Sequence, residues 1–234
     1  MLFRPERYEI NHRTIKLLIG LIAISLANVT AFFSSTPIAS ISASYYDEDW
    51  ARDFLVGSLF AISAFLFAYN GRSSREMLLS KIAAVSALGV ALFPCKCGDH
   101  PQLIPGVHVI SAAIMFVVLA LFCYTFYRRA KAKGHRQANW RAGIYVVCGL
   151  AIVASIALLA LDHFLGGVIS AKVVRLTFYC ERAALIAFGI SWLTASHVLP
   201  VITDPSERVS LLPNQTPRPA GDGPGTPVQM AGTR

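Results

Sequence analysis

Six long apolar stretches restrict the folds open to this chain of 234 residues. A helix needs about 20 mostly apolar residues to cross the hydrocarbon core of a membrane. The six stretches are close to that length, and with 55% hydrophobic and 15% charged residues the chain is too apolar for an ordinary soluble domain. We predict spans over 15–33, 53–69, 77–93, 107–127, 142–161 and 176–199.

The predicted fold class is an all-α membrane protein, a six-transmembrane-helix bundle. No stretch alternates between apolar and polar residues, and the run 110–126 is apolar on every face, which favours a helix over a barrel strand. Residues 1–14 form a predicted cytoplasmic N-terminus, 15–199 the transmembrane domain and 200–234 a disordered cytoplasmic tail rich in Pro and Gly.

The distribution of basic residues predicts the orientation. With both termini in the cytoplasm (N-in/C-in), most of the 21 Lys and Arg residues fall on the inner side, as the positive-inside rule requires. The residues left for the outer side are Arg52, Lys96, Lys172, Arg175 and Arg182.

The stretch 128–141, RRAKAKGHRQANWR, is the most basic part of the chain. We interpret it as a juxtamembrane loop that contacts anionic lipid headgroups, rather than as a nucleic-acid site. The chain has no Gly-rich phosphate loop, no G-x-S-x-G, no H-E-x-x-H and no C-x-x-C motif. Nucleic-acid binding and nucleotide hydrolysis are therefore not expected.

Three ionisable residues lie near the outer starts of predicted spans: Asp53, His108 and Glu181. A carboxylate at the depth of Glu181 is costly unless it has a partner or faces a polar interior. Because a helix N-terminus favours ionised carboxylates and neutral imidazole, the three would suit proton transfer or metal binding if they converge. The alternative is that Asp53 caps its helix and His108 is an interfacial side chain.

Further polar side chains are expected around this outward-facing pocket. Arg182, next to Glu181, is a partial partner for that carboxylate, although neighbours on a helix point about 100° apart. The candidate ligand-binding residues are Ser42, Tyr46, Arg52 and Arg182.

Two cysteines, Cys95 and Cys97, fall in a predicted outer loop with His100. Thiolates and imidazole are ligands for a soft metal ion, so these three are candidate metal ligands. In an oxidising compartment the two cysteines would instead form a disulfide. The cofactor is therefore unknown, with a divalent metal left open.

Several short segments carry a resemblance to known proteins. The stretches 41–46 (ISASYY), 52–57 (RDFLVG), 87–94 (ALGVALFP) and 187–192 (AFGISW), with His108 and Glu181, resemble a group of bacterial multipass inner-membrane proteins of unassigned activity. The likeness covers 15–194 and implies a bacterial cell inner membrane location. It marks as positions of interest Ser42, Tyr46, Arg52, Asp53, His108 and Glu181.

A more distant resemblance is to the alkaline ceramidases and adiponectin receptors, membrane hydrolases whose zinc site uses three His, one Asp and one Ser. This chain has no H-x-x-x-H pair. The leading hypothesis is an inner-membrane protein whose outer pocket binds a lipid headgroup or a small polar ligand. The alternatives are a hydrolase or transferase acting on a lipid amide or ester, in which Asp53, His108 and Glu181 are catalytic, and a small transporter or membrane scaffold.

Overall fold

The computed structural model describes residues 11–34, 37–47, 50–98, 100 and 103–204. Over these residues every regular element is helical and no strand occurs, which confirms the all-helical class. The elements are α1 (His12–Phe33), the 3₁₀ helix η1 (Ser42–Tyr46), α2 (Trp50–Ala68), α3 (Ser74–Leu92), α4 (Val107–Lys133), α5 (Arg136–Phe164), α6 (Val168–Lys172) and α7 (Leu176–Ser196). The predicted termini 1–14 and 200–234 lie largely outside the described residues.

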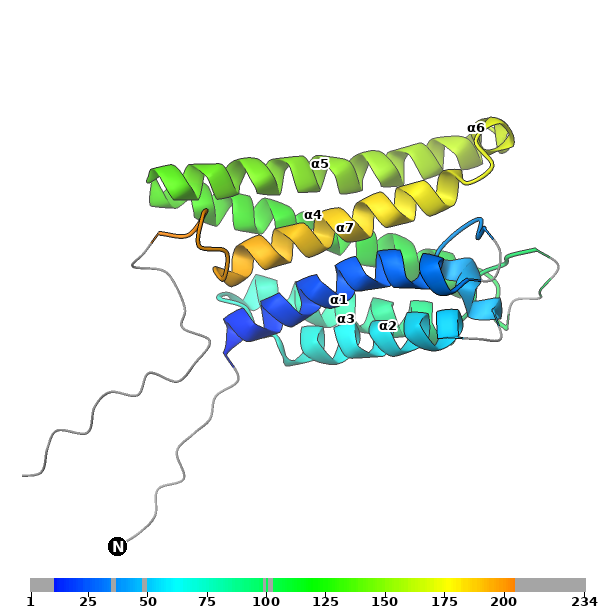
Figure 1. Cartoon of the computed structure of the whole chain (residues 1–234), viewed down its shortest axis with the longest axis horizontal. Helices are drawn as coiled ribbons and strands as arrows, with labels where there is room; N and C mark the ends of the chain where they lie inside the picture. The colour runs from blue at the N-terminus through cyan, green and yellow to red at the C-terminus, as the bar shows by residue number, and fades with distance from the viewer. Residues whose placement is uncertain (1–10, 35–36, 48–49, 99, 101–102, 205–234) are drawn as a thin grey trace, which may run out of the picture.

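The six long helices run back and forth along one axis (Figure 1). Each packs against its neighbours in the chain, and α1 packs against α7, so the helices close into a ring. Helix α4 also contacts α7 across the ring. The start of α1 and the end of α7 consequently lie at the same end of the bundle (Figure 1).

Five of these helices, α1, α2, α4, α5 and α7, are long and apolar enough to cross a membrane. Many large apolar side chains on the outside of the bundle are exposed, among them Phe67, Val147 and Leu150. In water such a surface would be costly, whereas lipid tails solvate it. Helix length and surface together support the predicted membrane protein.

An aromatic cluster fills the bundle around the buried Trp192 of α7. Its ring lies 5.2 Å from that of Phe122 and 5.7 Å from that of Phe126, both on α4, and 5.3 Å from that of Tyr69 (centroid distances). Edge-to-face packing at such distances stabilises a core beyond simple burial. The cluster therefore links α7 to α4 and to the end of α2.

The basic stretch 128–141 is not the loop predicted from the sequence. Helix α4 continues to Lys133, Gly134 turns the chain with a φ of 72°, and the His135 ring caps the start of α5 by accepting from the Ala138 amide. The prediction was wrong because Arg, Lys and Gln, although polar, are good helix formers. With 29 residues, α5 is about 43 Å long and exceeds a hydrocarbon core of about 30 Å.

Two glycines allow the close approach of α1 and α7. A Cβ at Gly189 would lie 2.5 Å from Ile24 Cγ1 and 2.8 Å from the Gly20 carbonyl oxygen. A Cβ at Gly20 would lie 2.8 Å from the Gly189 carbonyl oxygen. Neither backbone can move away alone, so only glycine fits at this crossing.

We expect Gly189→Ala to destabilise the bundle by about 1–3 kcal/mol, because the added methyl group overpacks the α1–α7 crossing. Gly57→Ala is the matched control: a Cβ there meets nothing within 4 Å, and alanine is the better helix former. Thermal unfolding in detergent micelles measures both. Equal midpoints for the two variants would contradict the close crossing.

Candidate functional site

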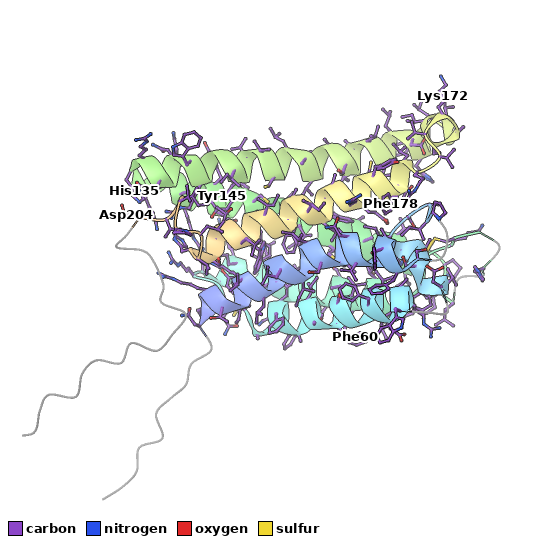
Figure 2. All side chains as sticks on the ribbon, viewed as in Figure 1. Phe60, His135, Tyr145, Lys172, Phe178 and Asp204 are labelled. Atoms are coloured by element: carbon purple, nitrogen blue, oxygen red, sulfur yellow. A yellow bond between two sulfur atoms is a disulfide. The ribbon has the colours of Figure 1, made fainter. Side chains whose placement is uncertain are left out.

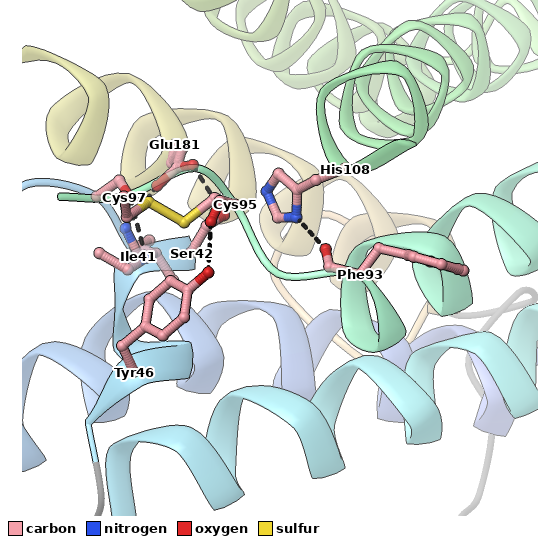
Figure 3. Close-up of a disulfide and its surroundings, with 10 residues drawn as sticks. Ile41, Ser42, Tyr46, Phe93, Cys95, Cys97, His108 and Glu181 are labelled. Carbon is pink, nitrogen blue, oxygen red and sulfur yellow. Dashed lines mark hydrogen bonds between the residues drawn. A yellow bond between two sulfur atoms is a disulfide. The ribbon is translucent and has the colours of Figure 1, made fainter. Parts of the chain in front are cut away.

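Glu181 is the centre of the best-defined polar site, at the end of the bundle where α1 stops and α7 begins. One carboxylate oxygen, Oε2, accepts a hydrogen bond from the Ile41 amide at 2.5 Å, and the other, Oε1, accepts from the Ser42 hydroxyl at 3.1 Å (Figure 3). Ile41 and Ser42 begin the 3₁₀ helix η1. The carboxylate thus satisfies amide and hydroxyl donors at a helix start, where partial positive charge favours an anion.

Further bonds fix the segment 37–47 over the helix ends; we call it the outer cap, after the side of the membrane predicted for it. In the first turn of α7 the Phe178 amide donates to the Ala39 carbonyl at 3.0 Å, and Arg175 Nε donates to the Ile38 carbonyl at 2.9 Å. Tyr46 donates its hydroxyl to the Cys95 carbonyl at 2.7 Å (Figure 3). Desolvation raises the pKa of the Tyr46 phenol, which keeps it a donor.

A small pocket lies beneath the outer cap, with a volume of about 30 Å³. That volume holds about two water molecules. Among the described residues, the polar side chains in its wall are Ser42 and Glu181. The rest of the wall is apolar and comes from α1, η1, α2, α3, α4 and α7 (Leu26, Ile41, Leu55, Leu59, Val90, Ala112, Met115, Phe116 and Leu185). The pocket therefore places one carboxylate and one hydroxyl in apolar surroundings.

His108 is buried at the start of α4 but does not line this pocket. Its Nδ1 lies 2.8 Å from the Phe93 carbonyl oxygen, at the end of α3 (Figure 3). Because a carbonyl oxygen only accepts, Nδ1 carries the proton, and in the neutral ring Nε2 keeps its lone pair. The contact orients the ring and joins α4 to α3.

Asp53 lies apart from both of these residues. Its side chain is 72% exposed, and its ion-pair partner is the neighbouring Arg52, at 3.7 Å. The structure therefore does not bring Asp53, His108 and Glu181 to a common point. Their joint catalytic role stays a prediction, with no shared geometry behind it.

Arg182 does not pair with Glu181. Its Nη2 donates to the Asn28 Oδ1 at 2.7 Å, which joins α7 to α1. Of the predicted ligand-binding residues, Ser42 alone lines the pocket with Glu181, and Tyr46 holds the outer cap.

Cys95 and Cys97 form a disulfide (Figure 3), the alternative left open by the sequence. In this form the two sulfurs offer no thiolate to a metal ion. His100 stacks on the Tyr46 ring, with centroids 4.0 Å apart. Among the described residues no group of three or more His, Cys, Asp or Glu side chains could hold a metal ion.

Two contributors were not predicted from the sequence: the amide of Ile41 and the buried carboxylate of Glu76. Main-chain donors leave no trace in a sequence, so the Ile41 contact could not be foreseen. Glu76 did leave a signal, because it is the only acid in the basic segment 72–81 and lies at the start of a predicted span. Its position predicts an ion pair with a cation from another helix.

Comparison with protein-family models, curated proteins and solved structures finds no match for this chain. The resemblances seen in the sequence stay expectations, and function must be argued from the site itself.

We expect Glu181→Gln to loosen the outer cap, because the amide nitrogen that replaces one carboxylate oxygen cannot accept a hydrogen bond. Hydrogen exchange of the amides in 41–46 should accelerate by about tenfold, the equivalent of one lost bond of about 1.4 kcal/mol. Asp53→Asn, which changes only an exposed carboxylate at the same end, should leave these amides unchanged. Unaltered exchange in Glu181→Gln would remove Glu181 as the anchor.

Proposed function

We propose that this chain is a bacterial inner-membrane protein that crosses the bilayer six times, with α3 as the third crossing and both termini in the cytoplasm. Helix α3 has 19 residues, as α2 does, and packs between α2 and α4 in the ring. Its charged residues Arg75, Glu76 and Lys81 all lie in its first half, toward the inner end. An even number of crossings returns the chain to the side where it began.

The gathering of basic residues at one end supports this orientation. Residues Lys16, Arg72, Arg129, Lys133 and Arg141, from four separate parts of the chain, line a single cavity at the end where α1 begins and α7 stops. Positive charge concentrates on the cytoplasmic side of inner-membrane proteins. That end of the bundle is then cytoplasmic, and the outer cap faces away from the cytoplasm.

Cysteine labelling tests the orientation. Val174 is 80% exposed at the outer end, and Ala132 is exposed near the end of α4; the three free cysteines are buried and the other two form the disulfide. With a membrane-impermeant maleimide we expect Val174→Cys to react in intact cells and Ala132→Cys only after permeabilisation. The reverse pattern would invert the topology.

The activity we propose is binding, by the pocket beneath the outer cap, of an amine-bearing lipid headgroup or a small polar ligand. The observation that carries it is the Glu181 carboxylate in an otherwise apolar wall, beside Ser42. A carboxylate has about four acceptor sites; the Ile41 amide and the Ser42 hydroxyl each occupy one, and the Ser42 amide also interacts with the carboxylate. The acceptor capacity left suits an N–H group of an amine, while the apolar wall suits adjoining methylene groups.

The volume of about 30 Å³ limits what enters while the outer cap is closed. One polar group of a ligand fits, and a whole headgroup requires the cap to lift. The lipid hydrolase or transferase alternative needs His108 beside a carboxylate, whereas His108 contacts the Phe93 carbonyl. No contact among the described residues specifically supports a transport or scaffold role.

Filling the pocket tests the binding proposal. Ala112 on α4 lines the pocket, whereas its neighbour Ala113 is exposed, so Ala112→Phe and Ala113→Phe form a matched pair. In phosphatidylcholine nanodiscs containing phosphatidylethanolamine, native mass spectrometry should find that the wild type and Ala113→Phe retain phosphatidylethanolamine. Ala112→Phe and Glu181→Gln should each lose about tenfold in retention. Equal retention by all four proteins would refute the proposal.

A further inference from the structure

A second cavity of about 30 Å³ lies at the opposite end of the bundle, between the start of α1, the loop before α3, the end of α4, the start of α5 and the end of α7. We call it the inner basic pocket. Its wall contains the cationic side chains Lys16, Arg72, Arg129, Lys133 and Arg141 beside His197. The cavity is separate from the pocket beneath the outer cap and shares no residue with it.

Lys16 is the most informative of these side chains, because it is only 7% exposed. Its Nζ lies 5.5 Å from the centroid of the Tyr69 ring and 5.2 Å from that of Phe126. It donates no hydrogen bond to any residue in the described part of the chain. An ammonium has three donor protons, and the two rings accept none of them as a conventional hydrogen bond, so these protons are available to an anion that enters the cavity.

Glu76 offsets only part of the positive charge. This carboxylate is 1% exposed, pairs with Arg129 Nη1 at 2.5 Å through Oε1, and accepts the Arg72 amide at 2.5 Å through Oε2. Gly71, with a φ of 63°, packs so closely that a Cβ there would lie 2.6 Å from Oε2. Glu76 is thus fixed between the α2–α3 turn and α4, and Lys16 is near it without a direct bond.

Arg141 and His197 form a further polar part of the wall and contact each other. Arg141 is buried on α5, and its Nη1 lies 3.1 Å from His197 Nδ1, at the left-handed end of α7. Asp204 lies at this end of the bundle as well (Figure 2). Glu76 and Asp204 are the carboxylates that the described residues place there, against five cationic side chains in the cavity wall.

We infer that the inner basic pocket binds a phosphate group, held by Lys16, Arg72 and Arg129. Phosphate has three or more acceptor oxygens, which suit an ammonium and planar guanidinium groups. Arg72 is exposed and Lys16 is buried, so the two would approach the anion from the rim and from the floor. The phosphate belongs either to a lipid headgroup of the adjoining leaflet or to a soluble phosphate compound.

The test uses the full-length protein in phosphatidylcholine nanodiscs, with two probes. Inorganic phosphate is titrated by calorimetry, and phosphatidic acid, added to the nanodiscs, is followed by native mass spectrometry. The variants are Lys16→Met, which keeps the length and apolar stem of the side chain, and Arg72→Gln. Lys131→Gln is the control. Lys131 is exposed and does not line the cavity, so this substitution removes one positive charge from the same end of the bundle without changing the cavity wall.

Both cavity variants should weaken binding by at least about tenfold, and the control by less than about twofold. Saturable binding of inorganic phosphate identifies a soluble ligand, and binding of phosphatidic acid alone identifies a lipid headgroup. No saturable binding of either probe overturns the inference, as does an equal loss in Lys131→Gln, which would indicate diffuse surface charge. If Lys16→Met fails to fold, the binding measured for Arg72→Gln tests the inference by itself, because the Arg72 side chain is exposed and does not belong to the core.

Discussion

The contact between α1 and α7 is the constraint on which the arrangement of the other helices depends. Five successive helix pairs follow from short connections in the chain, but only the first and last helices can close the ring. The glycines at 20 and 189 let the two backbones approach closely. In lipid, where apolar burial gives little drive for helix association, such close packing is a principal source of stability. Closure then defines an interior, with a small cavity toward each end.

Toward each end of the ring a carboxylate is held by hydrogen bonds, half-buried at Glu181 and fully buried at Glu76, but the two carboxylates have different surroundings. Glu181 accepts from an amide and a hydroxyl and stands among apolar side chains, so a ligand beside it should be a hydrogen-bond donor or a cation. Glu76 pairs with Arg129 and is outnumbered by cations, so a ligand beside it should be an anion. The same device, a carboxylate that ties a turn to a helix, thus produces opposite electrostatic preferences at the two ends.

Periodicity and hydropathy predicted the helices well, because a membrane demands long apolar segments that satisfy their own backbone. All six predicted spans coincide with long helices, with starts shifted by up to six residues, as in α5, where polar residues extend the helix beyond the apolar run. The site was harder to predict. Glu181 was identified from the cost of a buried charge, but its partners lie about 140 residues away, and one is a main-chain amide. Asp53 was predicted to line the pocket, but its side chain is exposed and does not do so. The sequence indicates how deep a residue lies along its helix, but not the direction in which its side chain points.

The proposed ligand binding fits the geometry of the pocket beneath the outer cap better than catalysis does. A general base needs a free lone pair directed at a substrate proton and a second group to receive or supply a proton nearby. Each carboxylate oxygen of Glu181 already accepts a hydrogen bond from the outer cap. The His108 ring is oriented by the Phe93 carbonyl at the end of α3. Both residues therefore hold parts of the fold in place before any ligand arrives. Under the proposed binding, ligand entry would be coupled to opening of the cap, since a donor that competes for Glu181 would weaken the bonds that keep the cap closed.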